Sequence, residues 1–146
     1  MLRKWMKRFK NQKGFTLVEL LAVIVILGII AAIAVPSIGG LINNSKKDAH
    51  IANAQQMVSA TRLAVTANEA EDGDNIQLGT LIDDGYLEPV DNPSADAYSQ
   101  TASFVTIERD EDNGNYTYTV TLESTDGTLH ADDIDPDTVT RDDIEL

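Results

Sequence analysis

The chain has 146 residues, a formal net charge of −13 and no cysteine, which excludes disulfides, thiolate metal sites and a cysteine nucleophile. Its length suits one modest domain with accessory segments. The charge is uneven, because residues 1–14 hold six basic residues and no acid, whereas the chain from Glu69 onward holds 22 acidic residues against Arg109 and Arg141. Because such an acidic surface repels phosphate backbones, we expect no direct nucleic-acid binding.

A long apolar segment follows the basic N-terminus. Residues 20–35 form an unbroken apolar run, and residues 15–19 extend it with only Thr16 and Glu19 interrupting. About 20 apolar residues span the hydrocarbon core of a bilayer as a helix. The preceding basic residues orient such a helix with residues 1–14 in the cytoplasm. A secretory signal peptide has a shorter apolar stretch and then a small-residue cleavage site, so we expect a membrane-spanning helix here.

Glu19 is the one charged residue in this span. A carboxylate costs roughly 2.5–3.5 kcal/mol at the centre of a bilayer and less near an end. Its side chain can reach the interface and have no further role, or it can receive a cation from another chain. The position of Glu19 alone does not choose between these two interpretations.

The segment KGFTLVE at residues 13–19 resembles the processing site of bacterial type IV prepilins and the related pseudopilins. That pattern has a basic leader ending in glycine, then phenylalanine, threonine, leucine, an apolar residue and glutamate, followed by an apolar helix. Pro36 also falls where this family usually has a proline. The resemblance covers about residues 10–65.

The resemblance implies specific roles for the residues of this motif. Gly14 precedes the bond cleaved by a membrane-embedded prepilin peptidase, and Phe15 becomes the new N-terminus and is methylated on its amine. Glu19 then attracts the Phe15 ammonium of a neighbouring subunit. Pairing two charges at low dielectric offsets a cost that each would otherwise carry alone. Uncleaved chains lack this cation and should assemble poorly.

Gly28 and Pro36 are predicted weak points of the same helix. Proline removes one backbone hydrogen bond, and glycine lowers helix propensity by about 1 kcal/mol. An ordinary proline kink is one interpretation of Pro36. The resemblance implies a second, in which this part of the helix loses its regular structure in the assembled filament.

The middle of the chain predicts a second, amphipathic helical stretch from about residue 45 to 68, continuous with the first and ended by Gly73. Its apolar residues recur at helical spacing: they are Ile51, Ala54, Met57, Val58, Ala60, Ala64 and Val65. A new helix starting at Ser45 is the alternative. A single helical turn follows, in which we expect Thr80 to cap the start and Gly85 to adopt the left-handed conformation after the end.

The C-terminal part is rich in β-strand signals. Residues 103–109 and 116–124 predict an antiparallel hairpin with a turn at Asn113-Gly114. A short third strand is expected near residues 128–130. We expect the acidic tail from Ala131 to be loosely ordered.

No catalytic motif is recognisable in the sequence. His50 and His130 lie in no metal or triad pattern, and His50 is expected to be an exposed helix residue. The tail offers oxygen ligands for calcium without a diagnostic spacing, at Asp132, Asp133, Asp135 and Asp137. We expect a solvated acidic surface with no cofactor, and no enzyme.

Together these features predict an α+β fold in which a long N-terminal transmembrane and amphipathic helix packs on a small antiparallel β-sheet, the lollipop form of type IV pilins. The expected segments are a cleaved basic leader (1–14), a transmembrane and filament-core helix (15–36), an amphipathic outer half of the helix (37–70), a globular head with a helical turn and a β-hairpin (71–125), and an acidic tail (126–146).

The resemblance, strongest to the major pilins of Gram-positive type IV pili, implies a structural subunit that self-associates through its N-terminal helix into an extracellular filament. The implied partners are the membrane before assembly, a prepilin peptidase, and the pilus-assembly ATPase with its platform. The expected location is the cell membrane, with the N-terminus cytoplasmic, and then the cell surface. The alternatives are a competence or type II secretion pseudopilin, and an uncleaved single-pass anchor presenting a binding module.

Overall fold

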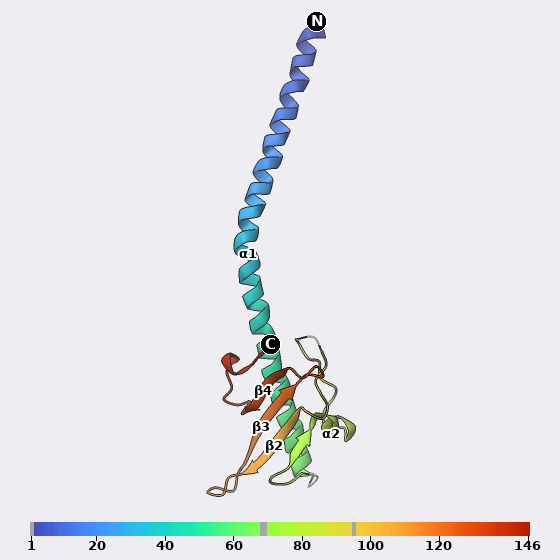
Figure 1. The fold of residues 1–146 in the computed structure, drawn as a ribbon, viewed down its shortest axis with the longest axis vertical. Coiled ribbons are helices and arrows are strands. Elements are labelled where there is room, and N and C mark those ends of the chain that lie inside the picture. Colours follow the sequence, from blue (N-terminus) through green and yellow to red (C-terminus); the bar gives the residue numbers. More distant parts are fainter. Residues whose placement is uncertain (1, 68–69, 95) are drawn as a thin grey trace. The chain divides into compact units, whose positions relative to one another are not determined.

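The computed structural model describes residues 2–67, 70–94 and 96–146, with side chains described from residue 16 onward. The elements in chain order are α1 (Leu2–Thr66), β1 (Asn75–Gln77), α2 (Leu78–Asp83), β2 (Phe104–Arg109), β3 (Tyr116–Glu123), β4 (Leu129–Ile134) and the 3-10 helix η1 (Arg141–Asp143) (Figure 1). The α+β class is therefore confirmed. The chain divides into two compact units, one up to Ile42 and one from Asn43 to Leu146.

The first unit is the N-terminal part of α1. By length and composition alone this helix can cross a membrane, and its most apolar window has a mean hydropathy of 3.0. The helix includes Pro36, which has no N–H to donate to the carbonyl one turn earlier. The next residue, Ser37, donates its hydroxyl to the Ile33 carbonyl at 3.0 Å. A polar side chain thus bonds a backbone carbonyl in the turn that the proline weakens.

The helix α1 continues without a break through Asn43 and Ser45. One continuous helix was the prediction, and the alternative of a new start at Ser45 is wrong. The expected end at Gly73 is also wrong, because α1 ends at Thr66. Gly73 has a φ of +85° and donates its N–H to the Ile107 carbonyl at 2.9 Å, so it directs the chain into the sheet.

The second unit contains a four-stranded antiparallel sheet in the order β1-β2-β3-β4. Val105 of β2 pairs with Val120 of β3, and the hairpin turn has Gly114 at a φ of +75°. The predicted hairpin is therefore confirmed. Strand β1 was not predicted, because three residues are too few to show an alternating pattern.

Helix α2 is the predicted helical turn, but its capping differs from the prediction. Thr80 lies inside the helix, and the N-cap residue Gln77 makes no side-chain cap. Backbone carbonyls of a neighbouring loop satisfy the first N–H groups instead: Leu78 donates to Ser103 and Gly79 donates to Gln100, each at 2.9 Å. At the other end, the left-handed Gly85 is confirmed, with a φ of +79°.

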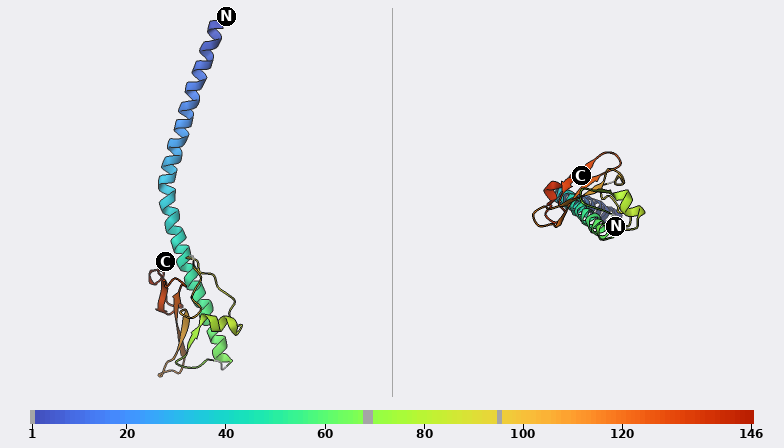
Figure 2. Two further views of the ribbon diagram at one scale, coloured as in Figure 1. Left: turned by 45° about the vertical axis from the view of Figure 1, so that its right-hand side comes forward. Right: turned by 90° about the horizontal axis from the view of Figure 1, so that it is seen from below.

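The core of the second unit lies between α1 and the sheet, and the strands run beside the C-terminal part of α1 in both side views (Figures 1 and 2). The predicted apolar face of α1 is confirmed, because Ala54, Met57, Val58, Ala60 and Ala64 are buried. They meet larger apolar side chains from the rest of the unit, which include Leu81, Val105, Val120, Leu122 and Ile144.

The acidic tail is ordered, contrary to the prediction. Strand β4 extends to Ile134, and Ile144 is buried in the core. Between them, η1 has a capping box in which the Asp143 carboxylate accepts from the Thr140 N–H at 2.8 Å. The third strand expected near residues 128–130 is confirmed as β4, but the sequence did not predict its extension to Ile134, because an edge strand can expose charged side chains such as those of its aspartates.

Candidate processing and assembly site

The predicted cleavage residues lie within the first unit. Gly14 and Phe15 are part of helix α1, and the Phe15 side chain lies outside the described part of the structure. Their roles in cleavage and methylation stay predictions. Phe15 and Glu19 are four positions apart, which places them on one face of a helix, about one turn or 6 Å apart along its axis.

Glu19 is exposed on α1. Residues 16–42 contain no lysine or arginine, so this part of the helix offers no cationic side chain to the carboxylate. If the chain is cut before Phe15, Glu19 lies in the first turns of the shortened helix. There the positive end of the helix dipole favours a carboxylate.

The rest of the first unit exposes an almost continuous apolar surface. The exposed fraction is 67% for Leu17, 69% for Ile33 and 70% for Leu41, and the leucine, isoleucine and valine side chains between them are more than half exposed. Soluble monomers rarely expose a contiguous apolar patch of more than a few hundred Å². This surface therefore requires lipid or other apolar helices around it.

The predicted weak points lie on the same surface. A Cβ built on Gly28 would meet no atom within 4 Å, and the same holds for Gly39 and Gly40. Glycines on an apolar helix allow a neighbouring backbone to approach closely. The loss of helical structure expected between Gly28 and Pro36 concerns an assembled filament, and it stays a prediction.

The calcium candidates do not form a ready-made site. Asp135 accepts the Asp137 N–H at 2.9 Å, and Asp137 is 3.3 Å from the Arg62 guanidinium. Asp132 and Asp133 are exposed on β4. In the part of the chain that the structure describes, no three histidine, aspartate or glutamate side chains are grouped to hold a metal ion.

His50 is buried, contrary to the prediction of an exposed residue. Its exposed fraction is 0%, and its ring stacks on the buried His130. The two rings belong to a polar network that also includes Tyr98 and Ser94. A signal was present in the sequence, because His50 precedes Ala54 by four positions and therefore shares the apolar face of α1.

Burial controls the ionisation of this network. It lowers the pKa of His50 from 6.5 to about 4, and the charges of His130 and Lys46 act in the same direction. Burial also raises the pKa of Tyr98 to about 12. At neutral pH His50 is therefore an uncharged ring and Tyr98 is an uncharged phenol.

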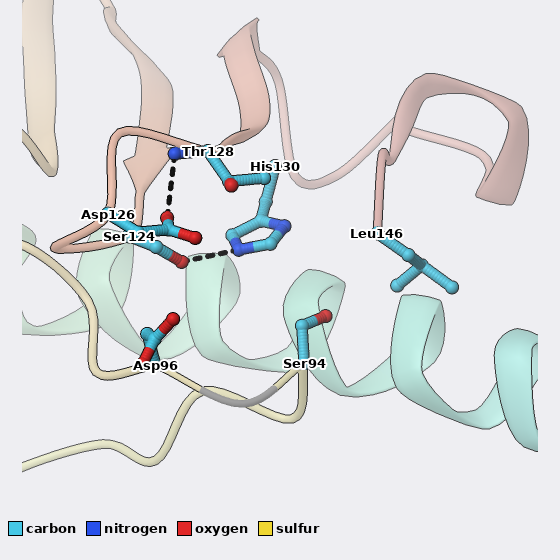
Figure 3. A pocket seen from close by; sticks show the side chains of 7 residues that line it. All are labelled: Ser94, Asp96, Ser124, Asp126, Thr128, His130 and Leu146. Atoms are coloured by element: carbon cyan, nitrogen blue, oxygen red, sulfur yellow. Dashed lines mark hydrogen bonds between the residues drawn. The ribbon is translucent and has the colours of Figure 1, made fainter.

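A small polar pocket of about 150 Å³ opens beside His130 (Figure 3). Asp126 lines it and accepts the Thr128 N–H at 2.9 Å, while Ser124 lies 2.6 Å from the Nε2 atom of His130. Asp96 and Leu146 also line the pocket. The polar groups of this pocket mostly bond one another, so its geometry indicates a structural role.

A basic N-terminus, an exposed apolar helix long enough to cross a membrane and a folded acidic unit together fit a membrane-anchored protein. Residues 9–35 match the family model described as the prokaryotic N-terminal methylation motif, which is the class III signal peptide of type IV pilins. This match supports the predicted resemblance to type IV pilin and pseudopilin precursors in the N-terminal part of the chain. No solved structure matches this chain.

Proposed function

We propose that the chain is a structural subunit that polymerises through its N-terminal helix into an extracellular, type IV pilus-like filament after cleavage between Gly14 and Phe15. The observation that carries this proposal is the combination of the methylation motif at residues 9–35 with an exposed apolar helix directly behind it. The motif is typical of structural proteins, and the proposed activity is assembly.

The exposed apolar surface supports two successive environments for the same helix. Before assembly, lipid covers the side chains between Leu17 and Ile42, with the basic residues 1–14 on the cytoplasmic side. In the filament, helices of other subunits replace the lipid. Both environments are apolar, so the transfer exchanges one apolar contact surface for another instead of exposing it to water.

Glu19 gives the transfer its selectivity. Cleavage creates an ammonium on Phe15, close in depth to Glu19, so an incoming processed subunit can supply the cation that residues 16–42 lack. An uncleaved chain cannot supply it, because its Phe15 nitrogen is an uncharged amide. We therefore propose that processing by a prepilin peptidase licenses assembly by the platform and its ATPase.

The second unit supports a role on the outside of the filament. From Asn43 onward it carries 23 acidic and five basic residues. A surface of this charge is hydrated and repels the equally acidic surface of another subunit, which favours solubility over contacts between second units. Contacts between the second units of neighbouring subunits therefore contribute less to assembly than contacts between helices. We expect the filament to tolerate salt.

Intact mass spectrometry of material sheared from the cell surface tests the proposal. We expect a species that begins at methylated Phe15, at an abundance that makes it a main component of the filament. A full-length chain confined to the membrane fraction would contradict the proposal and favour an uncleaved membrane-anchored module. A processed chain that is retained at the cell envelope would favour a competence or secretion pseudopilin.

A further inference from the structure

Two buried histidines meet inside the second unit. His50 comes from α1 and His130 from β4, and their ring centroids are 4.3 Å apart with an angle of 28° between the planes. They are the only histidines in the chain. Both have almost no exposed surface, with fractions of 0% and 2%. The hydrogen-bond partners of the two rings therefore determine which protonation state each ring can adopt in the core.

The partners of His130 require a neutral ring. Its Nδ1 atom lies 2.9 Å from the Glu145 carbonyl, which only accepts, so Nδ1 carries the proton. Its Nε2 atom faces the Ser124 hydroxyl at 2.6 Å (Figure 3). The same Nε2 atom lies 3.3 Å from the Asn92 amide nitrogen. The Asn92 nitrogen only donates, so Nε2 is an acceptor. A proton added at Nε2 would face the Asn92 N–H group.

The partners of His50 also favour a neutral ring. Its Nδ1 atom is 2.6 Å from the Tyr98 hydroxyl, which accepts from the Asn53 amide at 3.2 Å and so donates its own proton to His50. The Nε2 atom then donates to the Ser94 hydroxyl at 2.9 Å. Both rings thus have one donor and one acceptor in use. A charge on either ring would also repel a charge on the other across the stack.

The C-terminal segment, residues 135–146, is bonded to His130, on which the His50 ring stacks. The Glu145 N–H donates to the His130 carbonyl at 2.9 Å, so Glu145 is bonded to His130 through both its N–H and its C=O. Three side chains of α1 at seven-residue spacing bond the same segment: Asp48 bonds Arg141, Gln55 bonds the Pro136 carbonyl and Arg62 bonds Asp137. Residues seven apart lie on one helix face, so α1 and His130 hold the segment together.

The charged and titratable groups around the pair come from each neighbouring element. They are Lys46 on α1, Asp96 and Tyr98 in the loop before β2, Asp126 in the turn between β3 and β4, Asp132 on β4, Asp143 in η1, and Glu145. Lys46 opposes a charge on His50. The side chains of Asp96 and Asp126 are exposed, so water screens their attraction for a positive charge.

We propose that the stacked His50 and His130 form a pH-sensitive clasp, which holds the C-terminal segment on α1 while both rings are neutral and releases it when they are protonated. The hairpin of β2 and β3 does not depend on the clasp, because its partners are in the sheet and in the core. Acid therefore loosens one side of the second unit before the whole unit unfolds. This inference concerns the second unit and is independent of filament assembly.

Amide hydrogen exchange of the full chain in detergent micelles tests the clasp. The measured quantity is the protection of the Glu145 N–H relative to the Val120 N–H in β3, corrected for intrinsic exchange. We expect this ratio to fall by up to about a hundredfold between pH 6 and pH 5, as the uptake of two protons on opening requires. In the double variant His50→Gln with His130→Asn, which cannot take up these protons, the ratio should not change with pH.

Asp48→Asn is the matched control. It removes the carboxylate that pairs with Arg141, so the ratio should be lower at every pH with the same slope as in the wild type. A second measurement needs only the wild type. The NMR signals of the two histidines should change over the same pH range in which the Glu145 N–H loses its protection. The proposal is overturned if either histidine takes up its proton while Glu145 stays protected, or if the histidine-free variant keeps the pH slope.

Discussion

The two units of this protein differ in whether their apolar side chains are buried. In the first unit the apolar side chains between Leu17 and Ile42 are exposed. In the second unit the apolar side chains enclose one another, and no buried side-chain nitrogen or oxygen of the described residues lacks a hydrogen-bond partner. The second unit is complete within one chain, whereas the first requires lipid or other chains. Substitutions should therefore act on assembly in the first unit and on stability in the second.

The largest expected effect is the loss of processing. Gly14→Trp should leave only full-length chain, because a bulky side chain would occupy the position next to the cleaved bond. The readout is the intact mass of the membrane-bound protein. Gly28→Ala is the control, since its Cβ would meet no atom within 4 Å, and it should be processed normally. Normal cleavage of the Gly14 variant would contradict the assigned site.

Glu19→Gln should leave processing intact and reduce incorporation into filaments beside wild-type subunits. Removing one partner of a buried ion pair costs about 3–5 kcal/mol, because the other charge stays buried without compensation. We expect a strong depletion of the variant in sheared filaments of cells that express both chains, measured by mass spectrometry. Equal incorporation of the two chains would refute the charge-pairing account.

Leu81→Ala and Ile26→Ala compare the two units directly. Leu81 has an exposed fraction of 1% in the core, so its truncation should lower the free energy of unfolding of the second unit by about 2–5 kcal/mol. Ile26 is 56% exposed in the first unit, so its truncation should leave that free energy unchanged. Denaturant unfolding in detergent measures both. An equal loss of unfolding free energy in the Ile26 variant would contradict this difference between the two units.

The stability of the second unit should fall as the pH is lowered through the range of His50. Its pKa is about 4 in the folded chain against an ordinary 6.5, so the unfolded chain binds the proton first. The stabilisation is complete above pH 6.5, declines between pH 6.5 and 4, and amounts to about 3 kcal/mol in total. Thermal unfolding of the wild type and of His50→Gln should diverge over this interval, and parallel curves would exclude a contribution from His50.

The smallest expected effect is that of an exposed ion pair. The Arg62 and Asp137 side chains are 3.3 Å apart, with exposed fractions of 51% and 69%. Such pairs contribute less than about 1 kcal/mol and weaken with salt. Asp137→Asn should therefore change the midpoint of unfolding slightly at low ionic strength and not at all in high salt. A large change that persists in salt would indicate a role for Asp137 beyond this pair.

Elements with strong local signals could be predicted, and elements stabilised from a distance could not. The apolar run from residue 20 to 35, the apolar face around Ala54 and Met57, and the turn at Gly114 follow from hydropathy, helical spacing and backbone conformation. The extension of strand β4 beyond the expected residues 128–130 and the helix η1 do not, because their aspartates are typical of a solvent-exposed tail. Their order comes from Ile144, which reaches the core, and from Arg141, which pairs with Asp48 of α1.

The amino-acid sequence by itself determined the membrane-spanning helix, the methylation motif and the α+β class, because charge, hydropathy and a contiguous motif are local properties that need no partner. Only the tertiary structure decided the end of α1, the capping of α2, the order of the C-terminal segment and the burial of His50. Each of these depends on groups far apart in the chain, and His50 shows this most clearly. Burial is the main cause of its lowered pKa, and the rings of His130 and Tyr98 that cover it are 80 and 48 residues away.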